Sequence, residues 1–160
     1  MILSTDIPLE VRAVADRLRS AGYDAYLVGG CVRDLLLGKN PKDWDFTTDA
    51  VPEAIIAIFP DSFCNNDYGT VGVKTDSEDP RLAVVEVTPY RSEGEYSDAR
   101  RPDSVTFGVS LEEDLARRDF TVNAIVGELD FPSSEIFYFQ QQQFTFPVDT
   151  SMNVEIVGNK

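Results

Sequence analysis

Apolar residues recur at helical spacing near the N-terminus and in shorter strand-like runs further along the chain. Val11, Val14 and Leu18 recur every three or four residues until Gly22, which predicts a helix that begins near Pro8. The elements that we expect after it are strands over 25–28, 43–47, 69–74 and 83–88 and helices over 31–37, 51–59 and 110–117. This alternation predicts an α/β or α+β single domain with a mixed sheet.

Capping residues mark two of the predicted helix starts. Asp49 precedes the helix over 51–59 and is positioned to cap it. Ser110 and Glu113 have the spacing of a capping box, in which each side chain binds the backbone amide of the other residue. By contrast, residues 90–104 are polar and rich in charge, which predicts a long loop rather than an element.

The composition excludes several kinds of chemistry. The chain has 160 residues, with 28 acidic side chains, 14 basic ones, a net charge of −14 and no histidine. Ser-His-Asp triads, Cys-His pairs and imidazole zinc sites are therefore excluded, and any transfer chemistry must use carboxylates with a hard metal ion. Cys31 and Cys64 are too few for a disulfide framework. Free thiols and the lack of a membrane-spanning run predict a cytoplasmic protein.

The first candidate site is a glycine turn between a strand and a helix. Gly29 and Gly30 follow the strand over 25–28 and allow a ligand to approach the backbone, while the amides at the helix start suit a phosphate. Arg33, one turn into the helix, adds a positive charge with bidentate geometry. The GxGxxG pattern of dinucleotide binding is absent. The turn is therefore either a phosphate site or purely structural.

A pair of aspartates forms the second candidate site. In the strand over 43–47, alternation places Asp43 and Asp45 on one face and Trp44 and Phe46 on the other. Two such carboxylates repel each other unless a cation lies between them, and Mg²⁺ takes one or two carboxylates and fills its shell with water and substrate phosphates. The alternative is a solvated strand face.

A third carboxylate and a pair of arginines extend this hypothesis. Glu86 interrupts a β-branched strand, where acidic residues are depleted, so it is either a third metal-site carboxylate or an outward-facing surface residue. Arg117 and Arg118 directly precede Asp119. They are candidates for holding triphosphate oxygens, and the alternative is that they complement the charge at the end of the preceding helix.

Two long stretches resemble the signatures of the poly(A) polymerase head domain family, which includes class II CCA-adding tRNA nucleotidyltransferases and bacterial poly(A) polymerases. Residues 26–48, YLVGGCVRDLLLGKNPKDWDFTT, resemble the first signature, and residues 117–124, RRDFTVNA, resemble the second. Glu86 and the residues after it resemble the strand that lies between these signatures in the family, and residues 96–102 resemble its flexible loop.

The resemblance implies a nucleotidyltransferase fold similar to that of DNA polymerase β, with a mixed sheet flanked by helices. It implies that Asp43 and Asp45 hold catalytic Mg²⁺ and that Glu86 is a further catalytic carboxylate. The residues that it assigns to the nucleotide are Gly29, Gly30, Arg33, Arg117, Arg118, Asp119 and Asn123.

The implied reaction is attack of an RNA 3′-hydroxyl on the α-phosphate of CTP or ATP, which adds CMP or AMP and releases pyrophosphate. The implied partners are CTP or ATP and an RNA such as the tRNA 3′ end, bound directly or through a separate subunit. Two alternatives stay open: a nucleotidyltransferase with another acceptor, and a non-catalytic or partner-dependent head subunit. Because the neck, body and tail domains of the family do not follow, we expect a head domain over 1–126 and a divergent extension over 127–160.

Overall fold

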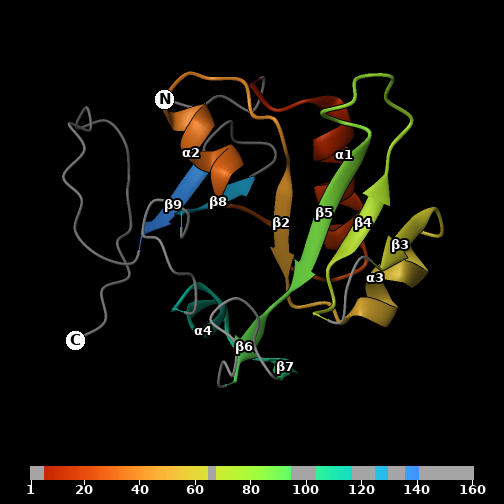
Figure 1. The fold of residues 1–160 in the computed structure, drawn as a ribbon, viewed down its shortest axis with the longest axis vertical. Helices are drawn as coiled ribbons and strands as arrows, with labels where there is room; N and C mark the ends of the chain where they lie inside the picture. Colours follow the sequence, from red (N-terminus) through yellow and green to blue (C-terminus); the bar gives the residue numbers. More distant parts are fainter. Residues whose placement is uncertain (1–5, 65–67, 95–103, 117–124, 130–135, 141–160) are drawn as a thin grey trace.

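A seven-stranded mixed sheet forms the centre of the computed structural model, which describes residues 6–64, 68–94, 104–116, 125–129 and 136–140 (Figure 1). The strand order is β3-β4-β5-β2-β1-β8-β9, and β2 and β5 run parallel whereas the other neighbours run antiparallel. The strands of this sheet are β1 Tyr26–Val28, β2 Asp45–Thr48, β3 Ser62–Cys64, β4 Val71–Lys74, β5 Val84–Pro89, β8 Ile125–Leu129 and β9 Ile136–Gln140.

Helices and a small ladder complete the described fold. The helices are α1 Leu9–Ser20, α2 Gly30–Leu36, α3 Pro52–Ile58 and α4 Leu111–Ala116. β6 Arg91–Glu93 pairs with β7 Val105–Phe107 at one end of the molecule, where β6 also contacts α4 (Figure 1). The mixed sheet with flanking helices confirms the predicted fold class.

The hydrophobic core lies between the sheet and α1. Val11, Val14 and Leu18, which predicted α1 by their spacing, are all buried in the same cluster as Val85 and Val87 of β5. α3 contacts α1, β3, β4 and β5, so it extends this layer toward the edge strand β3. The consequence for the site is that β2 and β5, at the middle of the sheet, are held by packing on their inward face.

Two of these local predictions on the described residues were wrong, and one strand was missed. Asp49 does not cap α3, because the helix begins at Pro52 with Val51 at the cap position; its Oδ1 instead accepts a hydrogen bond from the Asp24 amide at 2.7 Å. The region over 90–104 is not all loop, since β6 and β7 pair across its ends. β3 was also missed, because this edge strand has only three residues and two of them are exposed.

The capping box before α4 is confirmed. The Glu113 carboxylate accepts from the Ser110 amide at 2.9 Å, and the Ser110 hydroxyl accepts from the Glu113 amide at 3.2 Å. Reciprocal bonds of this kind satisfy amides that the first turn of a helix leaves unpaired.

The sheet continues beyond residue 126. β8 pairs with β1 in a register that matches Tyr26 with Glu128, and β9 pairs with β8. Both strands therefore belong to the same sheet as the candidate site. The division into a domain over 1–126 and an extension over 127–160 stays a prediction.

Candidate active site

Asp45 and Glu86 are brought together by the parallel pairing of β2 with β5, and Asp43 lies in the bend before β2, so the strand predicted over 43–47 in fact begins at Asp45. Asp45 lies opposite Glu86 in the register of the two strands. Trp44 and Phe46 are 3% and 0% exposed, so alternation turns Asp45 to the other face of the sheet, where it is half-buried. Val85 and Val87 on β5 are fully buried in the same way, which leaves Glu86 exposed on the face of Asp45.

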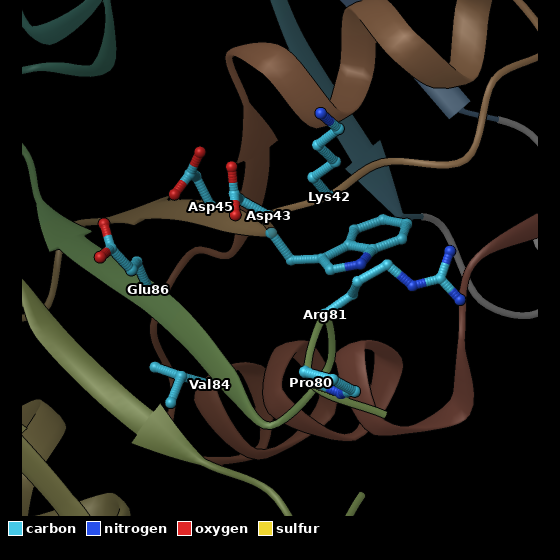
Figure 2. Close-up of a pocket in the computed structure, with 8 residues that line it drawn as sticks. Lys42, Asp43, Asp45, Pro80, Arg81, Val84 and Glu86 are labelled. Atoms are coloured by element: carbon cyan, nitrogen blue, oxygen red, sulfur yellow. The ribbon is translucent and has the colours of Figure 1, made fainter. Parts of the chain in front are cut away.

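These carboxylates line one pocket of about 410 Å³. In Figure 2 the Asp43 and Asp45 side chains lie next to each other, and Glu86 extends from β5 on the same side. The full lining is Lys42, Asp43, Trp44, Asp45, Pro80, Arg81, Val84 and Glu86. The structure thus places all three predicted catalytic carboxylates in one open pocket, which is of the size that small ligands occupy in proteins.

The chemistry of this donor set suits Mg²⁺ better than a metal enclosed by protein. Within the described residues, no group of three or more histidine, cysteine, aspartate or glutamate side chains is placed to hold a metal ion. Mg²⁺ needs only one or two carboxylates, because water and substrate phosphates complete its shell. Asp43 and Asp45, open to the pocket and two residues apart, fit that requirement, while Glu86 borders the same space.

The glycine turn precedes α2 and has the geometry that its sequence predicted. Gly29 has a φ of 77°, a conformation that glycine adopts without strain, and it occupies the position before the first residue of α2. A Cβ added at Gly30 would lie 3.5 Å from Nη2 of Arg33. The Arg33 guanidinium also forms a 2.8 Å salt bridge with Asp34. None of Gly29, Gly30 and Arg33 lines the pocket of the carboxylates, so the turn lies outside that pocket.

The remaining predicted nucleotide residues lie outside the described part of the chain. They are Arg117, Arg118, Asp119 and Asn123. α4 ends at Ala116, directly before the first of them, and its buried Asp114 connects it to the sheet. Asp114 Oδ2 accepts from the Thr47 hydroxyl at 3.0 Å, and Oδ1 accepts from the Arg91 amide at 3.3 Å.

Sequence reasoning missed several residues of this site. Lys42 and Arg81 line the pocket, yet Arg81 comes from the loop before β5, and no sequence spacing connects that loop to Asp43. Asp114 was treated only as part of a helix, although an aspartate next to the buried Leu115 was a signal that it faces the core. Cys31, outside the pocket, was treated as a plain thiol, but it is buried and its Sγ donates to the Val28 carbonyl at 3.2 Å.

The burial of Cys31 leads to a prediction for thiol reagents. Cys31 is 2% exposed, and burial raises the pKa of its thiol from 9.0 to about 12, whereas Cys64 is exposed. Because the thiolate is the reactive form, we expect a disulfide reagent at pH 8 to modify one thiol in the native chain and both after denaturation. Loss of the fast reaction in Cys64→Ser identifies the site, and rapid modification of both native thiols would contradict the assignment.

The raised pKa of the Cys31 thiol determines whether the stability of the fold rises or falls with pH. The unfolded chain loses the Cys31 proton near pH 9 and the native chain keeps it to about pH 12. The contribution of this thiol to stability is therefore complete below pH 9 and falls as the pH rises through that window.

Comparison with known proteins decides the family. The family model described as the poly(A) polymerase head domain matches residues 25–138, which include the glycine turn, the carboxylates and β8. The chain belongs to the poly(A) polymerase head domain family. This result confirms the resemblance seen in the two signature stretches.

The chain is also similar to curated CCA-adding enzymes. The chain is 50% identical over 117 residues to the CCA-adding enzyme of Geobacillus stearothermophilus, covering 72% of this chain and 28% of the relative. It is 45% identical over 133 residues to that of Listeria monocytogenes, covering 82% and 33%. The chain therefore spans about a third or less of the length of these relatives.

Solved structures show the same fold. The CCA-adding enzyme of Bacillus stearothermophilus in complex with CTP matches with a TM-score of 0.61 and 42% identity, over 75% of this chain and 28% of that one. A tRNA nucleotidyltransferase complexed with a primer tRNA and an incoming ATP analog matches with a TM-score of 0.53 and 26% identity, over 77% of this chain and 33% of that one.

None of the helices in the described part of the chain combines the length and the apolar character that crossing a bilayer requires.

Proposed function

We propose that this chain is the catalytic head of a nucleotidyltransferase that adds CMP or AMP, from CTP or ATP, to the 3′-hydroxyl of an RNA. The observation that carries the proposal is the register of Asp45 with Glu86, which brings Asp43, Asp45 and Glu86 into one open pocket in a member of this family. Its similarity to CCA-adding enzymes supports tRNA as the acceptor and the cytoplasm as the place of work.

Asp43 and Asp45 hold Mg²⁺ in this proposal, and Glu86 adds a third negative charge beside it. Bound Mg²⁺ would neutralise charge at the phosphates and lower the pKa of the attacking hydroxyl. The hydroxyl oxygen bonds to the α-phosphorus, the bond from that phosphorus to the bridging oxygen breaks so that pyrophosphate leaves, and the hydroxyl proton passes to water. The protein contributes position, because Trp44 and Phe46, buried in the core on either side of Asp45, fix that carboxylate.

The nucleotide lies on the other side of the aspartates in this proposal. Gly29 allows the backbone to approach the triphosphate, and Arg33 supplies a guanidinium close to the turn. Arg117, Arg118, Asp119 and Asn123 complete the nucleotide site, as the family signature at 117–124 implies. Asp114 ties α4, the helix that ends directly before Arg117 in sequence, to β2.

The test is incorporation of labelled nucleotide. The purified chain is incubated with tRNA that lacks its 3′ end, Mg²⁺ and one labelled nucleotide at a time, with and without excess chelator. We expect chelator-sensitive addition of CMP or AMP and no addition from GTP or UTP. Addition that persists in chelator would contradict the metal assignment. If the chain binds CTP with Mg²⁺ but adds nothing to tRNA, the proposed acceptor is wrong or a separate subunit must supply its binding.

A further inference from the structure

The pocket of the carboxylates has a second, cationic half. In the view of Figure 2, Glu86, Asp45 and Asp43 lie on one side of the pocket, and Lys42 and Arg81 lie on the other. All five line the same pocket, so a ligand that reaches the carboxylates also meets two positive charges. The chain has twice as many acidic as basic side chains, so the presence of two basic side chains in one pocket suggests that they bind an anionic group.

Lys42 is free to bind a ligand. It is exposed and, although Asp43 follows it directly in sequence, it makes no salt bridge within the described part of the chain. An ammonium group beside a carboxylate that binds a metal is a point charge with three donors. It can therefore hold an anionic group next to the metal-binding pair without displacing the metal.

Arg81 is held in place by its own loop. Its Nε and Nη2 bind the Asp79 carboxylate, the latter at 2.6 Å, and the Asp79 carboxylate also accepts from the Arg81 amide at 3.0 Å. This pairing raises the pKa of Arg81 and lowers that of Asp79. Nη1 makes no hydrogen bond to the described residues, and a guanidinium already fixed in orientation loses less entropy when it binds.

The rest of the pocket lining is uncharged. Pro80 and Val84 contribute apolar surface to the pocket, and Val84 is 37% exposed. The glycine turn and Arg33, which hold the triphosphate in the proposed function, lie outside this pocket. The side of the pocket that Lys42 and Arg81 line is thus left for the other reactant, whose hydroxyl must reach Asp43 and Asp45 and whose own phosphate needs a cation.

We propose that Lys42 and Arg81 form a subsite for the acceptor strand, which binds the backbone phosphate of its terminal nucleotide while the 3′-hydroxyl of that nucleotide lies at the carboxylates. This inference rests on the proposed function and goes further. It assigns Lys42 and Arg81 to the acceptor strand, and it assigns no contact with the phosphates of the nucleotide to either residue. Contacts to a phosphate position a strand without reading its bases.

The experiment measures RNA and nucleotide binding separately in the full chain. The RNA probe is a single-stranded hexanucleotide with a free 3′-hydroxyl and a 5′ fluorophore, read by anisotropy over a range of salt concentrations. The nucleotide probe is CTP with Mg²⁺, read by calorimetry. We expect Lys42→Gln and Arg81→Gln each to weaken RNA binding about threefold to tenfold at low salt. Each is also expected to reduce the slope of log affinity against log salt by about 0.7, and to leave CTP affinity unchanged.

Lys74→Gln is the matched control. Lys74 is 53% exposed, pairs with Asp61 and lies outside the pocket, so the same charge change there should alter RNA binding little. The inference is overturned if the Lys42 and Arg81 variants bind RNA like the control, if they lose CTP affinity instead, or if the unaltered chain does not bind the RNA. CTP binding in that last case shows that the proposed nucleotide site survives the failure of the inference.

Discussion

Asp45→Asn is expected to reduce Mg²⁺-dependent nucleotide incorporation by about a thousandfold or more while the fold is kept. The substitution preserves the shape of a half-buried side chain on β2, between the buried Trp44 and Phe46, and removes only its charge. The measurement combines the rate of incorporation with thermal unfolding of the same preparation. Mg²⁺-dependent CTP binding, measured by calorimetry, should weaken in parallel because the carboxylate pair is broken.

The matched control for this prediction is Asp16→Asn. Asp16 is exposed on α1 and lies outside the pocket, so the same change of charge should leave incorporation and CTP binding unaltered. Equal activity of Asp45→Asn and the unaltered chain would remove Asp45 from the catalytic set. Equal losses in both variants would show that net charge, rather than the pocket, controls the rate.

Asp114→Ala is expected to lower the free energy of unfolding by about 2–4 kcal/mol. Asp114 is fully buried, and its removal leaves the Arg91 amide without this acceptor and the Thr47 hydroxyl with only the Thr88 carbonyl, at 3.2 Å. A buried donor that loses its acceptor has no hydrogen bond to compensate for its lost hydration, so the full desolvation penalty destabilises the native state. Denaturant unfolding measures the effect, and Asp114→Asn should lose less because its amide can still bond to both groups.

Glu112→Ala provides the comparison on the same helix. Glu112 is exposed on α4, so its removal should change stability by less than about 0.5 kcal/mol. A double-mutant cycle with Thr47→Val then isolates the contact between Asp114 and Thr47, since the two residues share one hydrogen bond. A coupling energy near zero would contradict the role of Asp114 as the link between α4 and β2.

Local periodicity predicted which side chains share a face of the sheet. Trp44 and Phe46 are buried and Asp45 faces the pocket, as a period of two requires. Glu86 stands out between Val85 and Val87 for the same reason. What no local pattern contains is the register between the two strands, because the pairing of Asp45 with Glu86 joins segments forty-one residues apart in sequence. That pairing follows from packing across the whole sheet.

Long-range contacts explain the other differences. Arg81 lines the same pocket as Lys42 from the loop before β5, and the sequence offers no spacing that connects the two residues. Asp49 is a residue type that often caps helices. Its carboxylate accepts a hydrogen bond from the Asp24 amide, and α3 begins at Pro52, with Val51 at the cap position. A tertiary hydrogen bond thus overrides a local preference of about 1 kcal/mol.

Part of the excess of acidic residues is concentrated at the pocket. Three of the acidic side chains, Asp43, Asp45 and Glu86, border the same open space, where a divalent cation would relieve their repulsion. The negative charge of the chain therefore opposes nucleic acid in general, while the pocket offers Lys42 and Arg81 to one phosphate in particular. In this account the acidic side chains of the pocket bind the metal ion, and its basic side chains bind a phosphate of the acceptor strand.

Paramagnetic broadening by Mn²⁺ is the most direct test that the carboxylate pair holds the metal. Mn²⁺ replaces Mg²⁺ in oxygen sites, and NMR signals of nuclei near it broaden. With CTP present, we predict that the amides of Asp43, Asp45 and Glu86 and the indole of Trp44, the only tryptophan, broaden first. The effect should disappear in Asp45→Asn. Broadening that is centred elsewhere, or that persists in that variant, would contradict the account.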